Sequence, residues 1–215
     1  MEKRLLALLL AAVLVCSFAL AGCGKSEEKP AEEPQQEEQQ EEEPQEEEQE
    51  MPGAKYGYGG DDPVEAAVYQ YMAEEVTKNF DEAEVSIPTV NIVHVDYSNE
   101  EDVVVYGDFQ VDNYKVDGDT LKTVSGGSFP GVMHLAKDGE AYKVTSMDVV
   151  EDGGGFEESA KKLFGEHYED FMKVYSDDKA RDELRKITVS DYVNLNGLDI
   201  TKYQDEGQDP VELYK

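Results

Sequence analysis

A long stretch of this chain cannot take part in a hydrophobic core. Residues 24–52 are almost entirely Glu, Gln, Pro and Lys, with one Met and no aromatic side chain. Such a composition buries too little apolar surface to offset the entropy of ordering, and its like charges extend the chain. We therefore predict a disordered acidic tether, which limits folding to the residues that follow it. An acidic recognition tail is the alternative interpretation of the same tract.

The segment before this tract has the layout of a secretory signal peptide. Lys3 and Arg4 provide a positive start, and residues 5–20 form a nearly uninterrupted apolar run of 16 residues. A membrane-spanning helix needs about 20 apolar residues, so the shorter run favours a signal peptide that is removed. We therefore expect residues 1–22 to be absent from the mature protein.

The residues that close the apolar run, Leu20-Ala21-Gly22-Cys23, resemble the lipobox of bacterial lipoproteins. The resemblance implies cleavage before Cys23, whose thiol would carry a diacylglyceryl group. A single acyl chain binds a membrane only marginally, whereas two or more hold a protein durably. The implied location is the extracytoplasmic face of the cell membrane, with the membrane as a partner through the lipid anchor. An ordinary signal peptide that happens to end before a cysteine is the alternative.

Several classes of chemistry are absent from the mature sequence. Cys16, the only other cysteine, lies inside the predicted signal, so no disulfide, Cys-based zinc site or cysteine nucleophile is expected. The sequence also has no nucleophile-elbow, phosphate-binding loop, dinucleotide-binding or His-Glu-x-x-His motif. We predict no cofactor and no metal.

The net charge of −31 is concentrated in two acidic parts. Thirteen Glu and two Lys give the tract −11, the first 22 residues carry +1, and residues 53–215 carry −21. Nucleic acids require clustered Lys and Arg, and anionic membrane surfaces attract cations, so neither should bind the folded part. A protein, a wall polymer or a cationic ligand stays open as a partner. Acidity that only keeps the protein soluble is the alternative.

The folded part should be one domain over residues 61–215, preceded by the lipidated cysteine, the tether and a glycine-rich joint over residues 23–60. Its first element is predicted to be a helix, because Asp62 can cap it, Pro63 suits its first position and Glu65 completes a capping box. Apolar side chains then recur with helical spacing up to Phe80.

Four β-branched and aromatic runs follow this helix and predict strands. They cover residues 89–97, 102–116, 119–136 and 140–150. Asp117-Gly118 and Asp138-Gly139 separate consecutive runs and suit tight hairpin turns. Gly126-Gly127 and Pro130-Gly131 should bend or split the third run. We therefore predict a four-stranded antiparallel meander.

Two helices should follow the sheet, over residues 156–175 and from about residue 176 to 195, with residues 198–215 lying along the surface. The predicted fold class is α+β, with the N-terminal helix packed on the curved sheet. The element order of residues 62–150 resembles the cystatin-like and nuclear transport factor 2-like folds, in which a curved sheet wraps a helix. The resemblance implies either a pocket enzyme or a binding module.

Histidines are the candidates for acid-base chemistry. His94 and Asp96 lie two residues apart on a predicted strand, which places both on one face with Ile92. His134 could line the same pocket. Such a set could transfer protons or bind a metal, and ordinary sheet residues are the alternative. No catalytic residue is assigned beyond these candidates.

Other polar residues have simpler explanations. His167 lies on a predicted helix as a rim or surface residue. Asp112, Asp117 and Asp119 could offer oxygens to a hard cation, although a hairpin already explains the Asp-Gly pair. Thirteen Tyr and no Trp are compatible with a recognition surface, or with core residues whose hydroxyls reach the edge.

These observations predict a binding or adaptor lipoprotein at the cell envelope, of unknown ligand and with Cys23 as its lipidation site. The alternative is a small pocket enzyme that performs isomerase-like or dehydratase-like chemistry. An enzyme is the less favoured of the two, because no catalytic motif supports it.

Overall fold

The computed structural model describes residues 57–81 and 83–215. They belong to one compact unit, Gln45–Lys215. The predicted signal peptide, lipobox, Cys23 and acidic tether lie outside the described residues, so these stay predictions. No helix within the described ranges combines the length and the apolar character needed to cross a membrane.

The first helix begins where the sequence indicates. Helix α1 spans Pro63–Glu74, and the Asp62 side chain caps it by accepting hydrogen bonds from the backbone N–H groups of Val64 at 2.8 Å and Glu65 at 3.1 Å. The helix stops before Phe80, and a short 3₁₀ helix, η1 (Val76–Asn79), follows. The Thr77 hydroxyl donates to the Ala73 carbonyl at 2.7 Å and occupies an acceptor at the helix end.

The domain is α+β, and its sheet is mixed and has seven strands rather than the predicted four. The strands are β1 (Val85–Asp96), β2 (Val103–Asp117), β3 (Thr120–Ser128), β4 (Gly131–Asp138), β5 (Ala141–Val149), β6 (Lys202–Gln204) and β7 (Val211–Glu212).

Strand β2 is the centre of this sheet. Along one edge it pairs with β1, and along the other it pairs with β3 and then with β4, all antiparallel. Phe129 and Pro130 separate β3 from β4, so the predicted third run is split into two strands. Gly131 follows this corner, and a Cβ there would overlap the Asp148 carbonyl oxygen of β5. Only glycine therefore allows this approach of β4 to β5.

The C-terminal segment supplies the strands that the sequence analysis missed. Strand β6 pairs parallel with β3, and β7 pairs antiparallel with β6. Ile200 and Tyr203 are buried, so the prediction that residues 198–215 only lie along the surface was wrong. The apolar residues of this segment are too widely spaced to mark strands without the edge of β3 beside them.

The prediction of two C-terminal helices was also wrong, because the first one is broken. The segment folds as η2 (Gly153–Gly155), α2 (Phe156–Phe164), η3 (Gly165–His167), α3 (Tyr168–Tyr175) and α4 (Asp178–Leu195). Gly165 has a φ of +53° and a ψ of −120°, which turns the chain between α2 and α3. The helical spacing of apolar residues continues across Gly165, so the sequence pattern does not indicate the break between α2 and α3.

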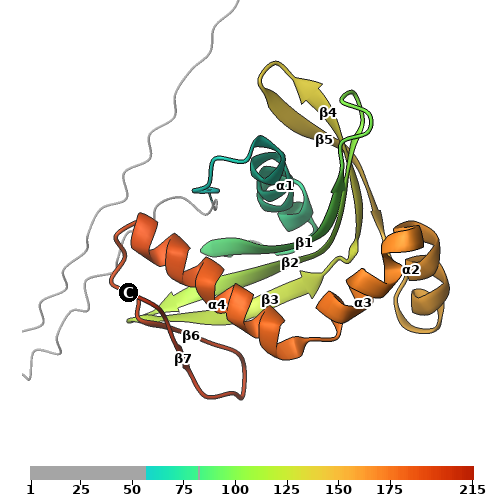
Figure 1. The fold of residues 1–215 in the computed structure, drawn as a ribbon. Helices are drawn as coiled ribbons and strands as arrows, with labels where there is room; N and C mark the ends of the chain where they lie inside the picture. Colours follow the sequence, from blue (N-terminus) through green and yellow to red (C-terminus); the bar gives the residue numbers. More distant parts are fainter. Residues whose placement is uncertain (1–56, 82) are drawn as a thin grey trace, which may run out of the picture. The chain divides into compact units, whose positions relative to one another are not determined.

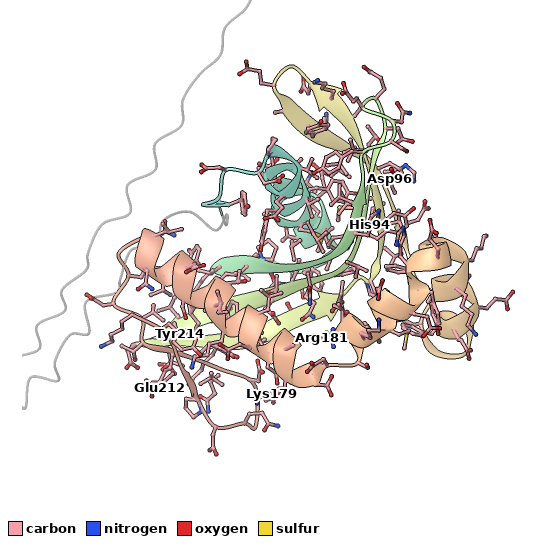
Figure 2. All side chains as sticks on the ribbon, in the orientation of Figure 1. His94, Asp96, Lys179, Arg181, Glu212 and Tyr214 are labelled. Carbon is pink, nitrogen blue, oxygen red and sulfur yellow. The ribbon has the colours of Figure 1, made fainter. Side chains whose placement is uncertain are left out.

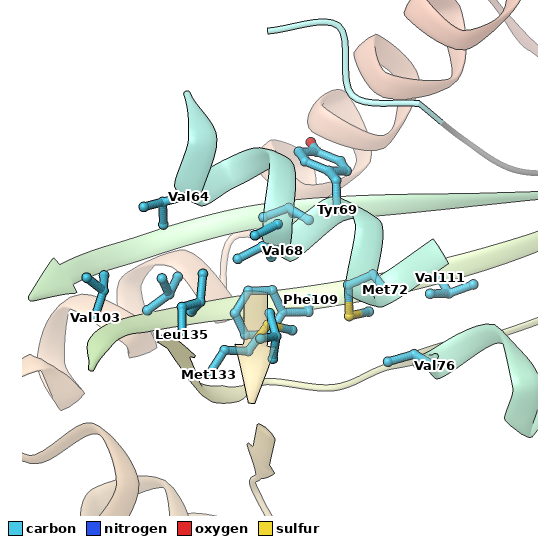
Figure 3. Close-up of a cluster of buried hydrophobic side chains, with 14 residues drawn as sticks. Val64, Val68, Tyr69, Met72, Val76, Val103, Phe109, Val111, Met133 and Leu135 are labelled. Atoms are coloured by element: carbon cyan, nitrogen blue, oxygen red, sulfur yellow. The ribbon is translucent and has the colours of Figure 1, made fainter. Parts of the chain in front are cut away.

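Helices cover both faces of the sheet. Helix α1 lies inside the bend of β1 and β2, and α2, α3 and α4 lie on the other side (Figure 1). The first core cluster joins α1 to β2 and β4 through side chains such as Val68, Met72, Phe109 and Met133 (Figure 3). A second cluster packs Tyr192 of α4 against β1, β3 and β6, and a third joins α2 and α3.

Candidate functional site

The structure places the three predicted site residues on β1 and β4, which flank β2. His94 stacks on His167, with ring centroids 4.0 Å apart, and both rings lie near Tyr106. A β-bulge between Ile92 and His94 puts Ile92 in the α1 cluster and His94 on the opposite face. The prediction that these two residues share a face was therefore wrong. Strict alternation fails because the bulge shifts the register.

The Asp96 side chain accepts a hydrogen bond in the turn that follows β1. Its Oδ1 accepts the backbone N–H of Ser98 at 2.8 Å. This hydrogen bond lowers the pKa of Asp96, and the nearby imidazoles of His94 and His167 add to the effect. A carboxyl with a lowered pKa stays ionised near neutral pH, which does not suit a general acid.

His134 has a different partner again. It lies on β4, and its Nδ1 is 2.9 Å from Oδ1 of Asp102. Figure 2 shows His94 and Asp96 at the bend of β1, on the side of α2. The structure thus pairs His94 with His167, Asp96 with Ser98 and His134 with Asp102. His94 and Asp96 lie near each other beside His167, and the hydrogen-bond partner of His134 is Asp102. A catalytic role for the three candidates stays a prediction.

The aspartates considered for a cation are engaged with basic side chains. Asp112 lies 3.0 Å from Arg185, Asp117 pairs with Lys122, and Asp119 lies 3.1 Å from Lys202. Among the described residues, no group of three or more His, Cys, Asp or Glu side chains is arranged to hold a metal ion.

A buried polar network beneath α4 was missed by the sequence analysis. Arg181 and Arg185 lie one turn apart on α4, and both contact aspartates of β2. Arg181 is labelled in Figure 2. Arg181 Nε donates to Oδ2 of Asp108 at 2.7 Å, and the Asp108 side chain is fully buried. Its guanidinium also lies 5.0 Å from the centroid of the Tyr175 ring.

Arg185 makes the larger set of contacts in this network. It binds both carboxylate oxygens of Asp205, at 2.9 and 2.8 Å, and donates to the Thr123 hydroxyl at 2.9 Å. Its guanidinium stacks on Tyr203, 4.6 Å from the ring centroid. The network thereby connects α4, β2, β3 and the segment after β6. The spacing of Arg181 and Arg185 could have indicated this network, because two arginines four residues apart lie on the same side of a helix.

Burial and the charge of Arg185 shift the pKa of Asp112 in opposite directions. Burial raises the pKa of Asp112 to about 6, and the neighbouring Asp205 adds to this, although Arg185 acts to lower it. The desolvation of the carboxylate thus outweighs its ion pair. Oδ2 of Asp112 is buried without a hydrogen bond, and its contact with Arg185 is an ion pair only. The other hydrogen bonds of Arg181 and Arg185 join α4 to the sheet and to the segment after β6.

An open groove lies where α1 ends against the corner of the sheet, and we call it the corner groove. Its volume is about 390 Å³, within the range of small-molecule sites. Three polar residues reach it: Asn79, Ser128 and Asp152. The rest of the lining is apolar or aromatic: Tyr71, Val76, Phe129, Met147, Val149 and Val150.

The corner groove is built by segments that are distant in sequence. Phe129 occupies the break between β3 and β4, and it packs edge-on against Phe80 with ring centroids 6.2 Å apart. Its backbone N–H donates to the Phe109 carbonyl at 2.7 Å, which fixes the corner. Val149, at the end of β5, is 41% exposed. None of His94, Asp96 and His134 lines this groove.

No protein family, curated protein or solved structure matches the chain.

Proposed function

We propose that this protein is a lipid-anchored binding module on the extracytoplasmic face of the cell membrane, and that the corner groove is its binding surface. The observation that carries the location is Cys23, which follows an apolar run and three lipobox-like residues. We also propose that residues 62–150 form a domain related to the cystatin-like and nuclear transport factor 2-like folds. The bend of the sheet around α1 supports it (Figure 1).

The lining of the corner groove favours binding over acid-base chemistry. Tyr71 and Asp152 are its only ionisable side chains, and no histidine or second carboxylate lies beside them in the lining. An isomerase or dehydratase needs a group positioned to take a proton and a group positioned to return it. The groove offers apolar area with few polar contacts, which suits recognition.

The described chain enters the domain along α1, before the corner groove. Tyr58 stacks on Tyr69 with ring centroids 5.0 Å apart, and its hydroxyl donates to Glu65 near the start of α1. The corner groove begins at Tyr71 and continues past Asn79. A helix rises about 1.5 Å per residue, so the groove starts roughly 9 Å along α1 from Glu65. Tyr69, the other contact of Tyr58, lies two residues before Tyr71.

Lipidation is tested by expressing the full chain and its Cys23→Ser variant in a bacterium supplied with labelled palmitate. We expect the unchanged chain to be labelled, to enter the detergent phase and to be cleaved by protease added to intact cells. The Cys23→Ser variant should lose the label and the membrane association. Cys16→Ser is the matched control and should keep both. Labelled protein in the Cys23→Ser variant would contradict the proposal.

A further inference from the structure

The corner groove contains one charged group and no charge that balances it. Asp152 is exposed, it immediately precedes η2, and its side chain makes no capping hydrogen bond to that turn. No Lys, Arg or His belongs to the lining. An anionic ligand would therefore meet an uncompensated carboxylate.

Two basic side chains adjoin residues of the lining, and both are already paired with acids. Lys78 precedes Asn79 in η1, and its Nζ is 2.7 Å from Glu75. Arg181 donates to the Ser128 hydroxyl at 3.3 Å, but its charge is matched by Asp108 at 2.7 Å. The charge at the groove is thus set by Asp152 and by a folded part that carries −21 in total. This field attracts cations.

The aromatic part of the lining favours the same kind of ligand. Tyr71 and Phe129 contribute ring surface to the groove, and the contact of Phe129 with Phe80 restrains its ring. The faces of aromatic rings attract organic cations. Met147 adds a side chain that adapts its shape to different apolar bodies. A ligand with an apolar body and one positive group uses all of these features.

We propose that the corner groove binds small amphiphilic organic cations, with the apolar body against Phe129 and Met147 and the positive group beside Asp152. This inference rests on the proposed function and specifies the ligand class of its binding surface. The volume of about 390 Å³ sets the size of the ligand at that of a small molecule.

The test compares three probes with one apolar body and different charges: phenylbutylammonium, phenylbutanol and phenylbutyrate. Each is titrated into the chain from residue 23 to 215 carrying Cys23→Ser, which keeps every described residue. Calorimetry measures affinity, and the methyl NMR signal of Met147 reports whether the probe enters the groove. We expect phenylbutylammonium to bind about fivefold more tightly than phenylbutanol, with phenylbutyrate weakest. The difference in affinity between phenylbutylammonium and phenylbutanol should decrease as salt is added, because salt screens the charge of Asp152.

Two variants identify the groups responsible. Asp152→Asn should reduce the affinity for phenylbutylammonium to that for phenylbutanol. Asp138→Asn, at the exposed end of β4, should leave both affinities unchanged. Val149→Thr keeps the shape of the side chain but makes it polar. It should lower the affinities for phenylbutylammonium and phenylbutanol by a similar factor.

Two results would overturn the proposal, and they are distinguishable. If phenylbutanol binds as tightly as phenylbutylammonium, the ligand class is wrong and the groove remains a binding surface. If no probe moves the Met147 signal at millimolar concentration, the groove fails as a binding surface as well. Neither result depends on the palmitate labelling of Cys23, which tests the location separately.

Discussion

At the scale of single residues, burial opposes the ionisation of Asp112 more strongly than Arg185 favours it. The pKa of Asp112 is raised to about 6, against about 3.9 in an unfolded chain. Between these values the folded protein holds a proton that the unfolded chain has lost. The contribution of Asp112 to the free energy of unfolding should therefore rise as the pH falls through 6 and level off below about 4. Above pH 6 the ionised carboxylate is a cost to the fold.

Replacement of Asp112 by Asn should remove this cost, because the amide resembles the protonated carboxyl in shape and charge. We expect Asp112→Asn to raise the free energy of unfolding at pH 8 by about 1–2 kcal/mol, and to flatten its increase between pH 7 and 5. Urea denaturation followed by circular dichroism at several pH values measures both. Asp119→Asn is the control and should destabilise at pH 8, because hydrogen bonds lower the pKa of Asp119. A less stable Asp112→Asn variant would mean that the ion pair outweighs burial.

Substitution of Arg185 should destabilise the fold, unlike substitution of Asp112. Arg185→Met leaves Asp112 without its cation and removes the paired hydrogen bonds to Asp205, so we expect a loss of about 3–5 kcal/mol at pH 8. The double variant Arg185→Met, Asp112→Asn should recover part of this loss, since no unpaired charge then stays buried. A double-mutant cycle of urea unfolding measures the coupling. Additive effects of the two single substitutions would show that the two side chains act independently.

At the scale of elements, the sequence specified those parts of the fold that local chemistry determines. Asp62 and Pro63 predicted the start of α1, and Asp117-Gly118 and Asp138-Gly139 predicted hairpins between strands that do pair antiparallel. Gly118 and Gly139 have φ values of +59° and +65°, as these turns require. The split of the third run near Pro130 also follows from residue type alone.

The features that the sequence did not reveal depend on contacts between distant segments. Strand β6 is three residues long and is defined by its pairing with β3, so its own residues give no strand signal. The bulge after Ile92 depends on how β1 meets β2. The corner groove likewise combines Tyr71, Phe129 and Asp152, which no periodicity connects. The sequence predicted a binding module, and the groove that we propose as its surface could not be found from the sequence.

The turn between α2 and α3 offers a test of one element boundary. Gly165 has a φ of +53° with open space where a Cβ would lie, so a side chain there meets backbone strain and no steric contact. We expect Gly165→Ala to lower the free energy of unfolding by about 1–3 kcal/mol. Gly154→Ala, in η2, also has open space and no positive φ, and should cause no loss. Equal effects of the two substitutions in thermal unfolding would contradict this account of the turn.

At the scale of the whole molecule, the dominant property is negative charge. The folded part carries −21, and its described ion pairs are mostly exposed, such as those of Lys78, Lys161 and Lys173. Exposed pairs contribute about 0–1 kcal/mol each, whereas a large net charge opposes the compact state through self-repulsion. Salt screens both effects. Because repulsion involves many more charges than pairing does, screening should favour the folded state.

We therefore expect the thermal midpoint of the Cys23→Ser chain to rise by about 3 °C when NaCl is increased from about 0.02 M to about 0.5 M. Differential scanning calorimetry measures the shift. If residues 27–50 form the predicted tether, their deletion should leave both the midpoint and its salt dependence unchanged, because a tether makes no packing contacts with the folded part. A midpoint that falls with salt would mean that ion pairs outweigh the repulsion. A salt response that disappears on deletion would mean that the tract interacts with the folded part, which would contradict the prediction that it is a spacer.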